Sequence, residues 1–171
     1  MIEEWEVIDK YGNLTGEIVK KSDPHAYEKG VYHWGADVWI LNSENKLLIQ
    51  KRSSVKRIEP NVWAMTGGNV MAGEDPKDTL VREAREELNI TLDPKELIYF
   101  TVVKTGNVLI KTYFMKHDYD ISKMKYKDDE VSEVKWATWK EIDDLVKNNE
   151  FISARWRYVK DYLKIRIEKG E

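Results

Sequence analysis

The apolar residues of this chain recur with two different periods, which predict strands in some segments and helices in others. Short runs of alternating or continuous apolar residues predict strands at 4–8, 16–19, 31–41, 47–52, 97–104, 108–115 and 131–137. Turn residues between the first two runs, and between the next two, predict β-hairpins. Gly67-Gly68 follows a short apolar run at 62–65, and we expect a turn there.

Three segments carry signals for helices instead. Asp75-Pro76 predicts the start of a helix that reaches Leu88, because Asp is a good N-cap and Pro fits the first helical position. Asn89 suits a left-handed residue at its end. The capping-box spacing at 138–141 predicts a short helix, and a last helix is expected at 153–167. The order of strands, helix, strands and two helices indicates an α/β protein with a mixed sheet covered by helices.

Composition excludes several classes of protein. The chain has 171 residues, of which 42% are hydrophobic, enough for the core of one domain. Its apolar runs are far shorter than the roughly 20 residues that span a bilayer. The acidic start lacks the basic and apolar regions of a signal peptide, so we expect a cytoplasmic protein.

The residue types restrict the possible chemistry further. The absence of cysteine excludes a disulfide scaffold, a thiolate zinc site and a cysteine nucleophile. Only three histidines are present, so a metal site would be built mainly from carboxylates. The net charge of -3 argues against a general nucleic-acid binder.

The helix predicted at 76–88 carries the most informative polar residues. Glu83, Glu86 and Glu87 share one stripe beside its apolar face. Like charges at this spacing cost roughly 0.2–0.5 kcal/mol per pair, unless a cation binds between them. Oxygen ligands at this density suit Mg²⁺ or Mn²⁺. The alternative is a solvated face on which Arg82 and Arg85 pair with the glutamates.

The residues around this helix resemble the Nudix box, which reads Gly-x5-Glu-x7-Arg-Glu-U-x-Glu-Glu-x-Gly-U, where U is bulky and aliphatic. The matching positions run from Gly68 to Ile90 and are Gly68, Glu74, Arg82, Glu83, Glu86 and Glu87. Ala84 is smaller than the expected aliphatic residue, and Asn89 replaces the final glycine. The wider resemblance covers about residues 31–145.

The resemblance implies the Nudix α/β/α sandwich with a mixed sheet. We expect residues 1–30 to form an N-terminal β-hairpin extension and linker. Residues 31–171 would form the Nudix hydrolase domain, including a C-terminal helix. The implied activity is Mg²⁺-dependent hydrolysis of a diphosphate linkage in a nucleoside diphosphate derivative or a similar small molecule.

The resemblance also implies roles for individual residues. Glu83, Glu86 and Glu87 would bind the metal, with the carbonyl of Gly67 as a further ligand. Arg82 and Glu74 would orient these glutamates. In this family the general base varies, and is a glutamate of the box or of a later loop. Glu130 and Glu133 are the later candidates, and a solvated acidic loop is the alternative interpretation of both.

Substrate contacts are expected from Arg52 at the end of its strand and from Gly67 and Gly68. Trp63 is a candidate for stacking on a base, although such tryptophans more often lie in a core or at its rim. Lys51, Lys56 and Arg57 extend the basic run around Arg52 and are further candidates for contact with the diphosphate, although surface solvation is the more common role of such residues. The partner is expected to be a small-molecule diphosphate, and dimers are common in the family.

Three other functions are alternatives to a hydrolase of small molecules. Residues 33–42 and 151–156 are similar to isopentenyl-diphosphate isomerases, but that chemistry needs a cysteine where this chain has Gly67, and Asn69 replaces a metal-binding histidine. We therefore exclude the activity and keep the kinship. A non-catalytic Nudix-fold module often loses glutamates of the box, whereas all are present here. A pyrophosphohydrolase of RNA 5′ ends would use the basic loop at 53–57.

Overall fold

The computed structural model describes residues 2–127 and 129–169. Its strands are β1 (Glu4–Ile8), β2 (Leu14–Lys20), β3 (His33–Leu41), β4 (Leu47–Arg52), β5 (Trp63–Ala64), β6 (Thr66–Asn69), β7 (Ile98–Thr105), β8 (Val108–Lys116) and β9 (Val131–Ala137). Its helices are η1 (Pro24–Tyr27), α1 (Pro76–Leu88), η2 (Ile121–Lys123), α2 (Trp139–Lys147) and α3 (Ser153–Lys169). Each strand and longer helix predicted from the sequence is present, within a few residues of its expected bounds.

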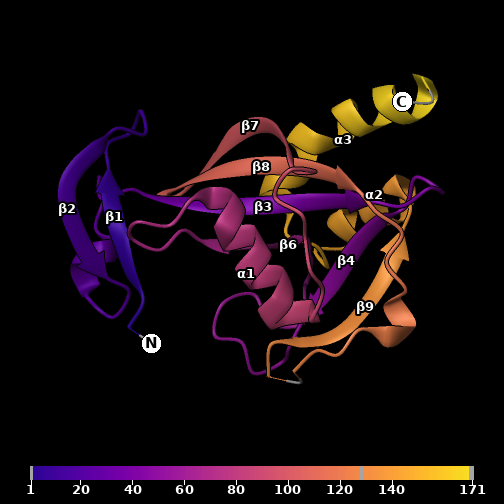
Figure 1. The fold of residues 1–171 in the computed structure, drawn as a ribbon, viewed down its shortest axis with the longest axis horizontal. Coiled ribbons are helices and arrows are strands. Elements are labelled where there is room, and N and C mark those ends of the chain that lie inside the picture. The colour runs from indigo at the N-terminus through magenta and orange to yellow at the C-terminus, as the bar shows by residue number, and fades with distance from the viewer. Residues whose placement is uncertain (1, 128, 170–171) are drawn as a thin grey trace.

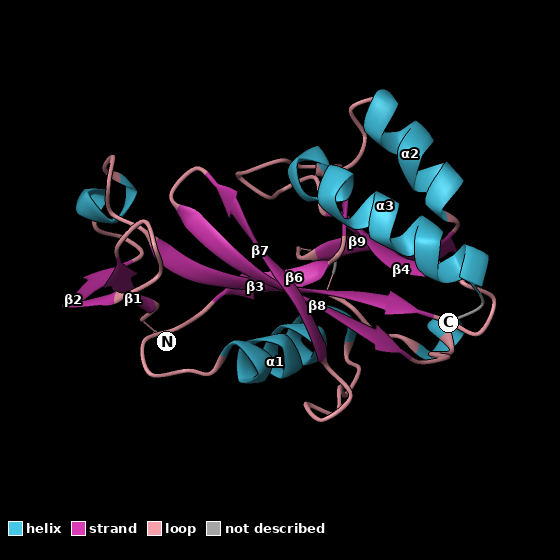
Figure 2. Ribbon diagram, turned by 90° about the horizontal axis from the view of Figure 1, so that it is seen from above, coloured by secondary structure: helices cyan, strands magenta, loops and turns pink. Residues whose placement is uncertain are grey.

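The main sheet is mixed. Its strands follow the order β5-β4-β3-β8-β7, with β6 paired to β3 and β9 paired to β4. The β3–β8 pair is parallel, whereas the other pairs are antiparallel. Helix α1 covers one face of the sheet, and α2 and α3 cover the other (Figure 2). This confirms the expected α/β/α sandwich.

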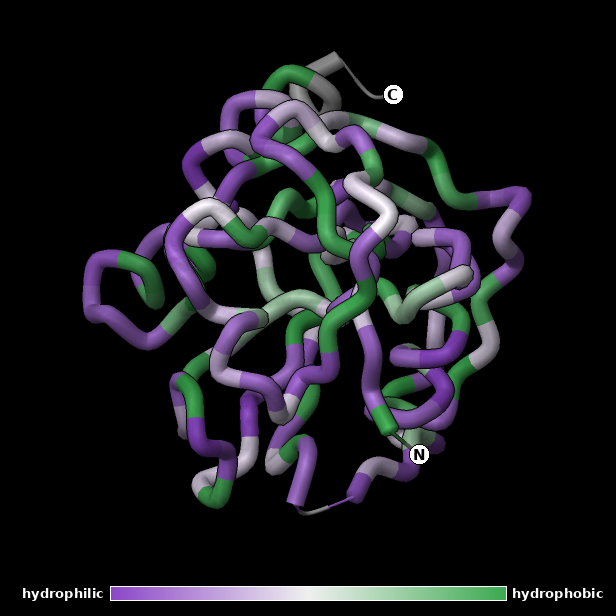
Figure 3. The backbone as a smooth tube through the Cα atoms, turned by 90° about the vertical axis from the view of Figure 1, so that its left-hand side faces the viewer, coloured by the Kyte–Doolittle hydropathy of each residue, from purple (hydrophilic) through white to green (hydrophobic). Residues whose placement is uncertain are grey.

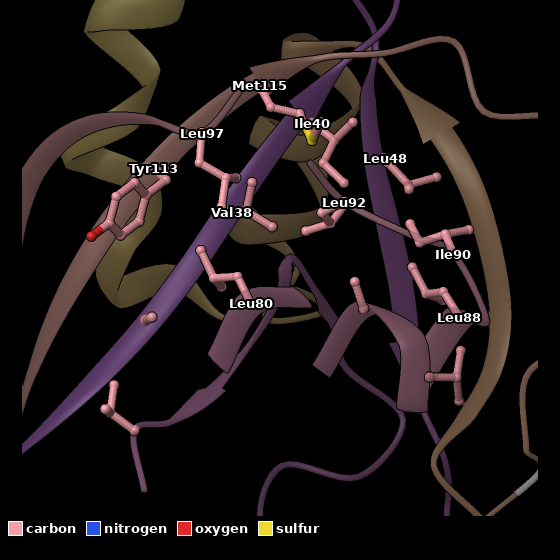
Figure 4. Close-up of a cluster of buried hydrophobic side chains, with 14 residues drawn as sticks. Val38, Ile40, Leu48, Leu80, Leu88, Ile90, Leu92, Leu97, Tyr113 and Met115 are labelled. Atoms are coloured by element: carbon pink, nitrogen blue, oxygen red, sulfur yellow. The ribbon is translucent and has the colours of Figure 1, made fainter. Parts of the chain in front are cut away.

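Strand β3 separates two hydrophobic cores because its side chains alternate between the faces of the sheet. Val38 and Ile40 point toward α1, where they pack near Leu80 and Leu88 (Figure 4). Trp39 belongs to the cluster on the opposite face, together with residues of α3. Both faces of β3 are therefore buried, which fixes its register in the centre of the sheet.

The N-terminal hairpin of β1 and β2 forms a separate small sheet at one end of the molecule (Figure 1). Hydrophobic and hydrophilic residues alternate along this end, which faces the viewer in Figure 3. Trp5 is 2% exposed and stacks on His33 of β3, with ring centroids 4.1 Å apart. The amide of Ala72 donates to the carbonyl of Glu4 at 2.8 Å. The hairpin is thus attached both to β3 and to the segment that precedes α1.

Two local expectations differ from the structure. Gly67 and Gly68 are in strand β6 and pair with Asp37 and Ala36 of β3, so the predicted turn at this position is wrong. Strands β3 and β4 are joined as a hairpin, but their paired residues are only Leu41 and Leu47. Beyond that point β3 pairs with β6, so the glycine-containing strand lies in the sheet itself.

Within the described residues, no helix is both long enough and apolar enough to cross a membrane.

Candidate active site

Helix α1 presents the carboxylates of the site, and its ends are fixed as the sequence predicts. The Asp75 side chain accepts a hydrogen bond from the amide of Lys77, and Pro76 is the first helical residue. Asn89 adopts the left-handed conformation, with φ of 54°, and closes the other end. The helix buries Leu80, Ala84 and Leu88, which turns the adjacent polar stripe toward β6.

Arg82 and Glu74 form the support of this stripe. The guanidinium donates two hydrogen bonds to Glu74, from Nε at 2.9 Å and from Nη2 at 3.0 Å. Its Nη1 donates to Oε1 of Glu83 at 2.6 Å and lies 3.5 Å from Oε2 of Glu86. Burial opposes ionisation of Glu74, but hydrogen bonds from Arg82 and Thr79 outweigh it and lower the pKa of this carboxyl. Arg82 is therefore fixed in one orientation by contacts with three glutamates of the box.

Glu87 is the most buried carboxylate of the stripe, with 8% of the residue exposed. Its Oε2 accepts a hydrogen bond from Nε2 of Gln50, on β4, at 2.6 Å. Burial raises the pKa of Glu87 to about 7, although the bond from Gln50 acts in the opposite direction. Burial also raises the pKa of Glu83, with Arg82 opposing the shift. Both carboxylates thus lie where a nearby cation would favour their charged forms.

The two glycines of β6 bring the strand close to neighbouring carboxylates. A Cβ on Gly68 would collide with the carboxylate of Glu83 and would lie 2.9 Å from its Cγ. A Cβ on Gly67 would collide with the carbonyl of Ala36 and would lie 2.9 Å from Cβ of Asp37. Both positions need glycine because of close approach, and neither glycine has a positive φ.

The polar stripe of α1 and the two glycines of β6 line one cavity of about 520 Å³. One part of its wall consists of Gly67, Gly68 and the carboxylates of Glu83, Glu86 and Glu87. Arg82 also lines it, as do four further residues with positive charge: Lys21, Arg52, Lys56 and Lys127. Glu130 lines the same cavity and contacts Nζ of Lys56. The cavity therefore combines a carboxylate cluster with a cationic wall.

The structure does not bring every candidate residue to the cavity. Trp63 is 5% exposed and packs in the core on the α3 side of the sheet, so it is not placed for stacking on a substrate there. Glu133 pairs with Lys51 along β9 and is exposed outside the cavity lining. Arg52 does line the cavity, while its guanidinium also donates to the carbonyls of Ile58 and Glu59.

The carboxylates of Glu83, Glu86 and Glu87 are suitable ligands for a divalent cation. In this structure, however, they do not converge on one position that a cation could occupy. Among residues 2–127 and 129–169, no three His, Asp or Glu side chains form a ready metal cluster. Glu83 is turned toward Arg82 and Glu87 toward Gln50, while Glu86 has 58% of its side chain exposed. A buried carboxylate bonded to a neutral amide favours a hard cation beside it, and oxygen-only donors suit Mg²⁺ or Mn²⁺.

A second arginine–carboxylate pair lies on the other face of the sheet. Asp37 of β3 is fully buried, and its Oδ2 accepts from Nη1 of Arg155, on α3, at 3.3 Å. Burial raises the pKa of Asp37, and the charge of Arg155 opposes that shift. Arg155 also lines a cavity of about 150 Å³ that includes Gly67 and Gly68. The two glycines thus separate this pair from the carboxylates of α1.

Several residues of the site escaped the sequence analysis. Gln50 is the only polar residue within the run Leu47–Gln50, which is the signal that could have indicated it. Lys21 and Lys127 lie in segments without a motif, and only the folded chain brings them to the cavity. Lys56 belongs to the basic run after Arg52, and its position at the cavity distinguishes it from Lys51.

Comparisons with known proteins identify the family of the chain. The family model described as NUDIX domain matches residues 31–162. An uncharacterized Nudix hydrolase of Listeria monocytogenes is 28% identical over 152 residues, which cover 88% of this chain and 89% of the relative. An isopentenyl-diphosphate Delta-isomerase of Shigella flexneri is 32% identical over 68 residues, covering 39% of this chain and 37% of the isomerase. The kinship with that branch is therefore confirmed over part of the chain.

Solved structures share the fold. A Deinococcus radiodurans protein superposes with a TM-score of 0.71 at 22% identity, covering 86% of this chain and 91% of that chain. The NUDIX domain of Shewanella oneidensis NrtR, complexed with ADP ribose, superposes with a TM-score of 0.63 at 15% identity. That match covers 86% of this chain and 94% of the NrtR domain.

Proposed function

We propose that this chain, which belongs to the Nudix family and is a hydrolase, cleaves the diphosphate linkage of a nucleoside diphosphate derivative in a reaction that depends on Mg²⁺ or Mn²⁺. One observation carries the proposal. A single cavity is lined both by the carboxylates of Glu83, Glu86 and Glu87 and by the cations of Arg52 and Lys56. Carboxylates suit a divalent cation, and arginine and lysine suit diphosphate oxygens.

The residues of the chain would divide the work as follows. Glu83, Glu86 and Glu87 would hold the cation, together with the carbonyl of Gly67. When bound, the cation supplies positive charge to the diphosphate oxygens and to the attacking water. Arg82 fixes Glu83 through its hydrogen bonds, because Glu74 in turn fixes Arg82.

The cationic wall would orient the substrate. Arg52 and Lys56 would neutralise the diphosphate oxygens that face away from the carboxylates, which stabilises the charge that builds up as the bond breaks. Arg52 is positioned by the carbonyls of Ile58 and Glu59, so its guanidinium does not have to be ordered when the substrate binds.

We assign the general base to Glu130 among the two later candidates. Glu130 lines the cavity, whereas Glu133 lies outside its lining. A base must reach the proton it removes directly or through one water, and of these two candidates Glu130 is the one that lines the cavity. Glu130→Gln should then lower kcat, while Glu133→Gln serves as the matched control and should leave kcat within about twofold.

Isomerase activity is not part of the proposal. The isomerases match this chain over 39% of its length, but their acid–base chemistry needs a cysteine, and this sequence contains none.

A release assay tests the proposal. The products of hydrolysis would be separated by ion-exchange chromatography after incubation with Mg²⁺ or Mn²⁺ and nucleoside di- and triphosphates, nucleotide sugars, ADP-ribose, dinucleoside polyphosphates or isopentenyl diphosphate. Water added across the linkage of ADP-ribose or a nucleotide sugar gives two monophosphates, whereas a nucleoside di- or triphosphate gives phosphate or pyrophosphate. We expect metal-dependent release of these products from a nucleoside diphosphate derivative, with its loss in Glu87→Gln. Folded protein that binds Mn²⁺ but releases nothing from any compound would overturn the proposal in favour of a binding module.

A further inference from the structure

The carboxylate cavity continues into a larger groove toward the N-terminal hairpin. This groove has a volume of about 740 Å³ and lies between the hairpin end of the molecule and the loop after β4. Lys21, Arg52 and Lys56 line both the groove and the carboxylate cavity. A ligand held by its diphosphate at the carboxylates can therefore extend past these three cations without crossing the protein.

Tyr27 provides an exposed aromatic surface in this groove. The residue is 56% exposed, yet its position is fixed at two points. Its hydroxyl donates to the carbonyl of Lys21 at 2.9 Å, and its ring meets Trp5 edge-on, with centroids 5.9 Å apart. Because Trp5 is buried, it cannot move aside. A fixed aromatic ring loses little conformational freedom when a planar group stacks on it.

Ile58 lines the same groove from the loop after β4 and is 67% exposed. Its position depends on Arg52, whose guanidinium donates to the carbonyl of Ile58 at 2.9 Å. Arg52 therefore links the two parts of the cleft. Its charge faces the diphosphate region, and its hydrogen bonds place an apolar side chain in the groove.

The sequence of chemical types along the cleft matches one class of ligand. Carboxylates come first, then the cations of Lys21, Arg52 and Lys56, and then Tyr27 and Ile58. A nucleoside diphosphate has the same order of complementary groups, with a metal-bound diphosphate at one end and an aromatic base at the other. A base stacks on an aromatic side chain whatever its identity, because each base has a π-face.

We infer that this groove is the nucleoside subsite, in which the base of the substrate lies against Tyr27 and Ile58. The inference rests on the proposed function and deepens it, since it assigns the specificity for a nucleoside to η1, which follows the N-terminal hairpin, and to the loop after β4. The NUDIX family match begins at residue 31, so Tyr27 lies outside the matched region.

Two non-hydrolysable ligands test the subsite directly. α,β-Methylene-ADP and methylenediphosphonate share the two linked phosphorus groups and differ by the nucleoside. Their dissociation constants would be measured by calorimetry with Mn²⁺ for the wild type, Tyr27→Leu and Tyr11→Leu. Tyr11 is the matched control because it is 76% exposed, lies in the turn between β1 and β2, and does not line the groove.

We expect Tyr27→Leu to weaken the binding of α,β-methylene-ADP about tenfold, a typical effect of losing one base–aromatic contact. Its binding of methylenediphosphonate should stay within twofold, and Tyr11→Leu should leave both constants unchanged. Tyr27→Phe keeps the ring, so it should retain most of the nucleoside affinity, and circular dichroism would verify that each variant is folded.

Two results would overturn the inference. The first is a Tyr27→Leu variant whose affinity for α,β-methylene-ADP stays within twofold of the wild type. The second is an equal loss for both ligands, which would mean that Tyr27 only supports the cleft. Failure of the proposed function would look different, since the wild type would then hydrolyse none of the compounds in the assay above.

Discussion

Two arginine–carboxylate clusters flank strand β6, and they differ in almost every physical respect. On the α1 side, Arg82 joins Glu74 to Glu83 within a stretch of ten residues, and this cluster lines a cavity of about 520 Å³. On the α3 side, Arg155 meets Asp37 across 118 positions of sequence, and Asp37 is fully buried. The first cluster leaves carboxylates available to a ligand, whereas the second connects a helix to the centre of the sheet.

Similar ion pairs therefore have different roles on the two sides of β6. A buried pair across distant elements mainly affects stability, because removing one partner leaves a charge without compensation. A partly exposed cluster beside a cavity contributes less to stability, since solvent screens it, and can orient ligands for a cation. If this division holds, substitutions on the two sides should separate stability from activity.

The largest effect is expected from breaking the α3-side pair. Asp37→Asn leaves Arg155 without its charged partner and should lower the free energy of unfolding by about 3 kcal/mol. This is the lower end for a buried pair, because 21% of the Arg155 side chain is exposed. Urea denaturation would measure the change. The double variant Asp37→Asn with Arg155→Met should recover part of the loss, and a single variant as stable as the wild type would contradict the structural role.

The next effect concerns the α1 side and appears in activity. Glu87→Gln should lower kcat/KM by about a hundredfold or more, which corresponds to about 3 kcal/mol of transition-state stabilisation. Its melting temperature should not fall, because an amide at this buried position removes the cost of burying a charge. A Glu87→Gln variant that loses stability and keeps its turnover would contradict the assignment of the α1 side to activity.

The reasons for these differences also explain what the sequence could and could not predict. The stripe of Glu83, Glu86 and Glu87 was predictable because it lies on one capped helix, where spacing determines geometry. The supporting role of Glu74, which precedes this helix, was expected only from the resemblance to the Nudix box. The bonds from Gln50 to Glu87 and from Arg155 to Asp37 were not predictable, because each needs a helix to pack on a strand that is distant in sequence.

The same limit accounts for the individual errors. Gly67-Gly68 looks like a turn when only neighbouring residues are considered, and it forms a strand because β3 offers backbone partners. Trp63 was a candidate for stacking on a base, with a place in a core as the more common alternative, and the core beneath α3 encloses it. In both cases the tertiary environment decides between the local alternatives.

Substitutions of the two neighbouring glycines of β6 should separate stability from activity within a single strand. Gly67→Ala places a methyl group against the backbone of Ala36 and Asp37, which cannot yield, so we expect a loss of about 1–3 kcal/mol in stability. Gly68→Ala meets the side chain of Glu83, which can move. The second variant should therefore remain nearly as stable while its kcat/KM falls about tenfold or more, because Glu83 is displaced. Thermal unfolding and kinetics of the pair would show whether the two losses separate.

The smallest effect tests whether the α3 side as a whole acts through stability. Asp143 of α2 accepts hydrogen bonds from Nε1 of Trp156 at 3.2 Å and from Nζ of Lys160 at 2.5 Å, and both donors belong to α3. The bond from Lys160, followed by that from Trp156, lowers the pKa of Asp143 to about 2.

A carboxyl whose pKa is lower in the folded state stabilises the fold above its unfolded pKa, and the contribution disappears as the pH falls through the folded value. Asp143→Asn should therefore cost about 1 kcal/mol at neutral pH, a modest amount because the site is largely solvated. The difference between wild type and variant should shrink between about pH 4 and pH 2. Since α3 supports the sheet and does not line the carboxylate cavity, kcat at neutral pH should stay within about twofold. An Asp143→Asn variant with unchanged stability but reduced kcat would show that the α3 side contributes to catalysis.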